Sequence, residues 1–155
     1  MQTIFHSSAT NKVDAKGRVS IPAPFRNALR DGGDSTLYLM PEIMERPAIM
    51  GFGAGHYRRL AESVMTMPPF DPVAEALSDA LGSEARELPL DGTGRIVLPA
   101  DLKALAEIEE DALFISRLTH FQIWKPENYA AMKADLRRTA RENASALPWS
   151  TARTA

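Results

Sequence analysis

The stretch Val13–Arg26, VDAKGRVSIPAPFR, occurs a second time in the chain as Leu90–Lys103, LDGTGRIVLPADLK. The two segments align without a gap and share an aspartate, a glycine, an arginine, a proline and an alanine. The five identities in fourteen positions exceed the roughly one that background amino-acid frequencies would give. The chain is therefore predicted to contain two copies of one unit. The identical pairs are Asp14/Asp91, Gly17/Gly94, Arg18/Arg95, Pro22/Pro99 and Ala23/Ala100.

Each repeated segment predicts the same local structure, a rigid loop followed by a strand and a helix. The aspartate can accept hydrogen bonds from backbone donors two or three residues on, and the glycine permits a turn conformation that other residues avoid. The alternation that follows favours a short strand with Val19 and Ile21 on one face and Arg18 on the other. A proline ends each strand and favours a short helix, over Pro22–Arg30 and Pro99–Glu107.

Runs of aromatic and β-branched residues favour further strands over Thr36–Met40, Ala112–Ser116 and Phe121–Lys125. The fold class predicted is α+β, mainly β with short helices. A unit of strand, strand, helix, strand and strand has about fifty residues, which is small for a self-sufficient core. Each copy is therefore expected to need the other copy, another subunit or both to bury its apolar face.

The segments outside the repeats are expected to be helical or loose. A helix is predicted over Pro72–Gly82, and Pro126 is expected to open a longer helix with an apolar face of Tyr129, Met132 and Leu136. Pro47–Gly55, whose glycines are too loosely spaced for a nucleotide fingerprint, is expected to be a flexible strand-to-helix connection. The predicted division is a first repeat domain at 8–55, a connecting helical segment at 56–83, a second repeat domain at 84–128, a C-terminal helix at 129–143 and a loose segment at 144–155.

Charge is unevenly distributed along the chain, although its net value is only -2. Residues 1–30 hold five lysines and arginines against Asp14 alone, which is +4, whereas residues 84–111 hold eight acids against three bases, which is -5. A locally basic segment can contact the phosphates of nucleic acid even when the whole chain has a slightly negative net charge. The first copy is therefore expected to contribute more to such a contact than the second.

Several classes of function are disfavoured by composition. The absence of cysteine, with only three histidines in the sequence, argues against disulfides, a metal site or a cofactor. The sequence shows no Gly-rich phosphate loop, no His-Glu-x-x-His and no nucleophile elbow, so neither an enzyme nor a small-molecule substrate is expected. Asp14 and Asp91 would form a carboxylate pair if the repeats met, but the adjacent arginines would more simply neutralise them. No apolar run is long enough to cross a membrane, and the N-terminus lacks the layout of a secretory signal, so a cytoplasmic location is expected.

The Asp-x-x-Gly-Arg loop has two interpretations. A rigid loop projects its arginine from a fixed base, which limits the side-chain entropy lost when the arginine contacts a phosphate or a guanine edge. Alternatively, Asp14 pairs with Arg18 across its own turn and makes only a rigid corner. Two copies with the same positions, one of them in a basic segment with Lys16 at the loop tip, favour the binding interpretation.

The segments Asn11–Arg26 and Leu90–Lys103, together with Phe121–Tyr129 (FQIWKPENY), resemble the MraZ family of bacterial transcriptional regulators. The resemblance extends over roughly residues 5–143 in the same order and spacing. It implies two tandem AbrB-like (SpoVT-type) swapped-hairpin β-barrel units followed by the C-terminal helix. It also implies subunits assembled into a ring on the nucleoid. The implied partner is double-stranded promoter DNA with direct repeats, in the division and cell-wall gene cluster that includes the protein's own gene, and the usual effect is repression.

Carried over by position, the residues that the resemblance implies as DNA contacts are Lys16, Arg18 and Arg95. Arg18 is expected to contact base edges, Lys16 and Lys12 to bind neighbouring phosphates, and Arg95 to make a weaker supporting contact. Thr93 stands where the first copy has Lys16 and is expected to donate a hydrogen bond to a phosphate.

Two other functions remain open. One is a structural oligomerisation protein that uses the same duplicated barrel without touching nucleic acid. The other is a regulator of the antitoxin kind, which would need a toxin-binding C-terminal segment; the sequence from Trp149 to Ala155 shows no clear amphipathic pattern.

Overall fold

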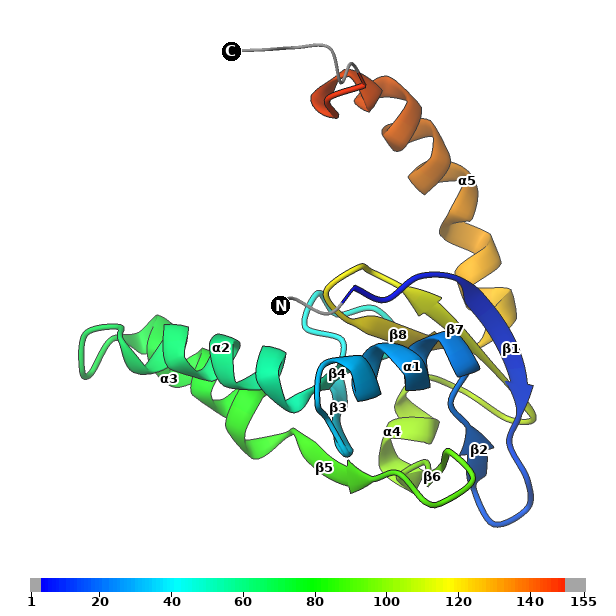
Figure 1. Ribbon diagram of the computed structural model, residues 1–155. Coiled ribbons are helices and arrows are strands. Elements are labelled where there is room, and N and C mark those ends of the chain that lie inside the picture. Colours follow the sequence, from blue (N-terminus) through cyan, green and yellow to red (C-terminus); the bar gives the residue numbers. More distant parts are fainter. Residues whose placement is uncertain (1–3, 150–155) are drawn as a thin grey trace.

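The computed structural model describes residues 4–149 and is a mixed α+β structure, which confirms the predicted fold class (Figure 1). The first copy supplies a strand, a short strand, a helix and two longer strands, and the second copy supplies the same series. Two helices connect the copies. The elements of the first copy are β1 (Ser8–Lys12), β2 (Arg18–Ser20), α1 (Ala23–Asp31), β3 (Thr36–Pro41) and β4 (Ala48–Gly53); the connection comprises α2 (Ala54–Met65), α3 (Pro72–Ser78) and a π-helical turn (Asp79–Ser83); the second copy comprises β5 (Arg86–Pro89), β6 (Arg95–Val97), α4 (Ala100–Leu105), β7 (Asp111–Ser116) and β8 (Phe121–Trp124); α5 (Pro126–Glu142) and a 3-10 turn (Ala144–Ala146) follow.

The two copies exchange strands with each other within one chain. The strand order is β1-β7-β8-β4-β3-β5 in a six-stranded sheet, and β2 pairs with β6 in a separate two-stranded ribbon. The first strand of each copy pairs with the third strand of the other, in β1–β7 and β3–β5, and equivalent strands pair in β2–β6 and β4–β8. The tandem units that the resemblance implies are thus two interleaved halves, in agreement with the expectation that one copy does not close its own core.

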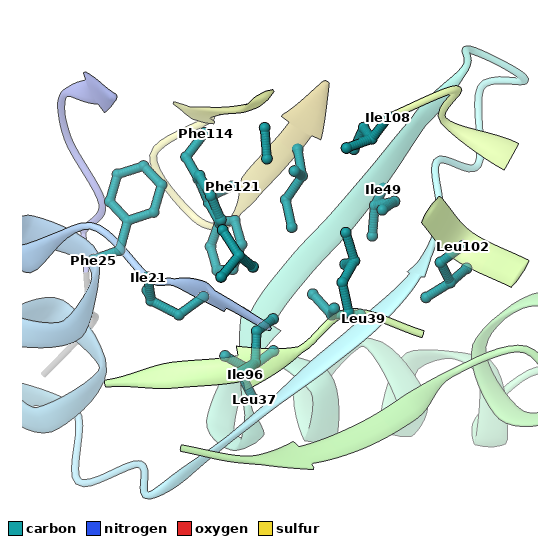
Figure 2. Packing of buried hydrophobic residues seen from close by; sticks show 14 of the residues in the cluster. Ile21, Phe25, Leu37, Leu39, Ile49, Ile96, Leu102, Ile108, Phe114 and Phe121 are labelled. Carbon is teal, nitrogen blue, oxygen red and sulfur yellow. The ribbon is translucent and has the colours of Figure 1, made fainter. Parts of the chain in front are cut away.

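Both copies contribute to the main hydrophobic core (Figure 2). Phe25 of α1 lies 5.1 Å from Phe121 of β8 and 6.2 Å from Phe114 of β7, measured between ring centroids. Ile21, which directly follows β2, and Ile96, which lies in β6, are buried in the same cluster. Since burial of apolar surface is the main stabilising term, this shared core fixes the position of the ribbon.

The prediction of a flexible connection at Pro47–Gly55 is wrong, because most of this segment is β4, which lies inside the sheet between β3 and β8. The two glycines of β4 have close neighbours. A Cβ atom on Gly51 would lie 2.4 Å from the Phe121 ring, and one on Gly53 would overlap the Asp34 carboxylate. The loose glycine spacing thus reflects tight packing of the strand.

The helix α5 begins at Pro126, as predicted, and its apolar face packs on the outer side of the sheet. Tyr129 is buried against Trp124, and Met132 and Leu136 extend this second cluster. Beyond these turns α5 leads away from the sheet (Figure 1). Within residues 4–149, no helix combines the length and apolar character needed to span a membrane.

Candidate nucleic-acid interface

The loop between β1 and β2 is held by the Asp14 carboxylate. One oxygen, Oδ1, accepts hydrogen bonds from the backbone nitrogens of Lys16 at 2.9 Å and Arg18 at 2.8 Å, and the other, Oδ2, accepts from Arg18 Nε at 2.7 Å. The backbone hydrogen bond from Arg18 is the largest cause of a lowered Asp14 pKa. Gly17 completes the turn at φ +82°, a conformation that disfavours any residue with a Cβ atom.

The loop between β5 and β6 repeats this geometry around Asp91, with two additional contacts made by the Thr93 hydroxyl. Asp91 Oδ1 accepts from the backbone nitrogens of Thr93 at 2.8 Å and Arg95 at 2.9 Å, and Arg95 Nε lies 3.2 Å from Oδ2. The Thr93 hydroxyl donates to Asp91 Oδ1 at 2.7 Å and accepts from Arg95 Nε at 2.9 Å. These donors, led by the Arg95 backbone, lower the Asp91 pKa strongly. Thr93 therefore bridges the aspartate and the arginine of this loop. In the first loop the contacts between Asp14 and Arg18 are direct.

The ribbon brings the two loops together. In the antiparallel register Arg18 lies opposite Val97 and Ser20 opposite Arg95. Each loop is tied to the far end of the partner strand, because Ile21 donates to the Gly94 carbonyl at 2.9 Å and Leu98 donates to the Gly17 carbonyl at 2.8 Å. The two Asp-x-x-Gly-Arg loops, 77 residues apart in the chain, thus form one site.

Arg18 and Arg95 share the outer face of this ribbon. Residues that lie opposite one another, or two apart on one strand, point to the same side, so the two arginines are diagonal neighbours about 7–8 Å apart at the backbone. Val19 and Ile96 point to the other side and are buried. Both arginines line one shallow hollow of about 260 Å³ together with Asp91 and Val97.

Each of these arginines keeps part of its guanidinium free. Only Nε is used in the contact with its aspartate, and each side chain retains 39% of its solvent exposure. Among residues 4–149, the terminal nitrogens of Arg18 and Arg95 have no hydrogen-bond acceptor. Planar donors on a fixed base suit a bidentate acceptor such as a phosphate or a guanine edge.

The lysines predicted for the site differ in their surroundings. Lys16 is exposed at the tip of the first loop. Lys12 lies at the end of β1, where its Nζ is 2.9 Å from Asp111 Oδ1 of the facing strand β7. This hydrogen bond raises the Lys12 pKa, so Lys12 carries its charge beside a compensating carboxylate.

Arg26 is a residue of the site that the sequence did not reveal. Its side chain crosses from α1 to the second loop, where a Cβ atom on Gly94 would lie 2.2 Å from Arg26 Cδ, and Nη1 donates to the Ile21 carbonyl. The second loop, which belongs to the acidic part of the sequence, thereby gains a cation from the basic first copy. The charge of each copy, counted along the sequence, does not reveal this contact, because strand exchange brings a residue of the first copy beside the loop of the second. Across residues 4–149, no three potential metal ligands cluster.

Three relatives are similar to this chain over almost its whole length. They are named "Transcriptional regulator MraZ" and come from Rhodospirillum rubrum, Xanthobacter autotrophicus and Azorhizobium caulinodans. The identities are 41%, 37% and 36%, over 91%, 92% and 89% of this chain and 90%, 90% and 87% of the relatives. The chain belongs to the MraZ family.

A family model described as "MraZ protein, putative antitoxin-like" also matches residues 81–147, which contain the second loop and α5. The MraZ relatives are named as regulators of transcription and not as enzymes, which supports the prediction that this chain is not an enzyme. Membership confirms the resemblance inferred from the two loops.

Proposed function

We propose that this MraZ-family chain is a sequence-specific DNA-binding regulator that inserts the β2–β6 ribbon into the major groove of promoter DNA. The observation that carries the proposal is the placement of Arg18 and Arg95 on the outer face of one two-stranded ribbon. The major groove of B-DNA admits a two-stranded ribbon, and arginine pairs with guanine O6 and N7.

Lys16 and Lys12 supply phosphate contacts beside the first loop. Thr93, at the position equivalent to Lys16, donates its one hydroxyl proton to Asp91 and holds Arg95 in place instead of contacting a phosphate. Arg18 contacts base edges, with Arg95 in support. Arg26, which lies against Gly94, makes the second loop more favourable for DNA than its neighbouring acids suggest. Contacts of this kind are few for one chain, so useful affinity comes from several subunits on repeated sites, where linkage raises the effective concentration.

The proposed target is a set of direct repeats upstream of the division and cell-wall gene cluster, including the protein's own gene, and the proposed effect is repression. The protein acts as a ring-shaped homo-oligomer in the cytoplasm, on the nucleoid. Membership of the MraZ family and the two-loop site support this target and this assembly.

The test is binding of the full chain to a duplex from its own upstream region, with a duplex lacking the repeats as the DNA control. Arg18→Ala is expected to abolish specific binding and Arg95→Ala to weaken it. Arg58→Ala, an exposed arginine of α2, is the matched protein control and is expected to bind like the wild type. Full affinity of Arg18→Ala would exclude its role in base contact.

Salt dependence separates this proposal from the structural alternative. Phosphate contacts predict an affinity that falls steeply as salt rises, by about 0.9 in the logarithmic slope for each phosphate neutralised. A purely structural oligomerisation protein would bind neither duplex at any salt concentration.

A further inference from the structure

The C-terminal part of the chain forms an arm that leads away from the body of the molecule (Figure 1). We define the arm as residues 133–149. Lys133, Arg137 and Arg141 follow one another at intervals of four, so they lie on one face of α5. All three are exposed, and within residues 4–149 none of them makes an ion pair, whereas Arg138 beside them is paired with Asp135 at 3.0 Å. The arm thus carries an uncompensated basic stripe.

The end of the arm adds large apolar side chains to this charge. Leu147 is 57% exposed and Trp149 is 71% exposed. The Trp149 ring is nevertheless held in place, because its Nε1 donates to the Ala144 carbonyl at 2.6 Å. Tryptophan and arginine are the residue types that most often dominate binding at protein–protein interfaces, and a ring fixed in advance loses less entropy on binding.

A complementary pocket lies on the body, between the β3–β4 loop and the π-helical turn. Its volume is about 480 Å³, enough for one large aromatic side chain, and Met40, Ile43 and Leu105 supply apolar walls. Ile43 and Leu105 remain 43% and 42% exposed. Three glutamates and one arginine line the pocket, so its charge is opposite to that of the arm.

The two segments that frame this pocket are irregular. Glu45 adopts φ +61°, which is unfavourable for a residue with a side chain, and Asp79–Ser83 forms a π-helical turn just before Glu84. Both kinds of irregularity are enriched at functional sites. Glu45, in the first segment, and Glu84, which follows the π-helical turn, both line the pocket.

We propose that the pocket of one chain receives the arm of a second copy, with Trp149 between Ile43 and Leu105 and with Arg137 and Arg141 facing Glu45 and Glu84. The acidic lining of the pocket and the apolar tip of the arm favour a protein contact over a nucleic-acid contact. The arm and the β2–β6 ribbon lie on opposite sides of the body (Figure 1). One chain therefore does not present the arm and the ribbon to the same stretch of DNA. The contact is head-to-tail and leaves an unused arm and an unused pocket until a ring closes. This inference rests on the homo-oligomer of the proposed function and identifies its interface.

The test is sedimentation of the full chain without DNA over a range of concentrations. Trp149→Ala, the pair Arg137→Glu and Arg141→Glu, and the pair Glu45→Arg and Glu84→Arg are each expected to raise the dissociation constant of the assembly about tenfold or more. A chain with all four charge reversals is expected to assemble again, because its two surfaces are complementary once more. Phe70→Ala and Glu75→Arg, exposed residues away from the arm and the pocket, are the matched controls and are expected to leave assembly unchanged.

Assembly of the arm and pocket variants like the wild type would overturn the inference, and so would a monomeric wild type. Arm variants that assemble normally but lose DNA affinity would show that the arm is a nucleic-acid contact instead. Arg18→Ala separates the two proposals, because it should lose DNA binding and sediment like the wild type. Retained DNA binding by Arg18→Ala would refute the role of the loop and leave the interface standing.

Discussion

The Asp91 carboxylate is stabilised in its charged form by donors of its own loop, so its pKa lies below its usual range. A group of this kind contributes stability above its unfolded pKa of about 3.9 and loses it as pH falls through the lower folded pKa. The loop is therefore expected to keep its hydrogen bonds throughout the neutral and mildly acidic range. A carboxyl titration followed by NMR should give a midpoint for Asp91 below that of a free aspartate.

Thr93 tests the cause of this shift. Thr93→Ala removes a hydrogen bond to the carboxylate and should raise the Asp91 midpoint, whereas Thr93→Ser keeps the hydroxyl and should leave it in place. An unchanged midpoint in Thr93→Ala would show that backbone donors alone hold the charge.

His120 gives a second pH prediction, with a different range. Burial lowers its pKa to about 4, with further contributions from the parallel His56 ring 6.3 Å away and from Arg117. Between pH 6.5, near the unfolded pKa, and pH 4 the unfolded chain binds more protons than the folded chain, so stability falls as pH falls. Urea unfolding between pH 4 and 7 should show this slope, and His120→Gln should reduce it. An equal slope in the variant would place its origin elsewhere.

At the scale of the elements, the turn into β6 provides a matched pair of glycines. Gly94 has φ +79°, whereas Gly92, two residues earlier in the same loop, does not have positive φ and has open space around its Cβ position. Gly94→Ala is expected to lower the free energy of unfolding by at least about 1–2 kcal/mol, because a Cβ atom is unfavourable in the left-handed region and would also displace the Arg26 side chain. Gly92→Ala should be close to neutral. Equal effects of the two substitutions in chemical denaturation would contradict this account.

Local elements were predictable from the sequence because local chemistry determines them. The aspartate, glycine and proline of each repeat specify a turn, a strand and a helix start, and the structure confirms α1, α4 and the opening of α5 at Pro126. The strand β4 was missed because the Phe121 ring, which explains the glycine at position 51, comes from the other copy. The position of Arg26 was missed for the same reason. Neither contact can be derived from local spacing, since both depend on strand exchange.

At the scale of the whole molecule, strand exchange makes the two halves mutually dependent. Every strand of the first copy pairs with a strand of the second, and the main core takes residues from both. A single cooperative unfolding transition is therefore expected for the region that these strands form.

Cutting the chain between the halves tests this dependence directly. The fragments 1–83 and 84–155, each expressed alone, are expected to show no cooperative unfolding. Each fragment keeps only one strand pair, β3–β4 or β7–β8, and loses the four pairings with the other copy and the residues that the other copy adds to the core. Mixed or co-expressed, they are expected to associate and to recover one transition, since the same strand pairs and the same core can form without the covalent link. Phe121→Ala in the second fragment is the control, because it removes a ring that packs on Phe5 and Phe25 of the first and should weaken the association. Cooperative unfolding of either fragment alone would mean that one copy closes its own core, and the exchanged arrangement would then be an alternative pairing of two self-sufficient units.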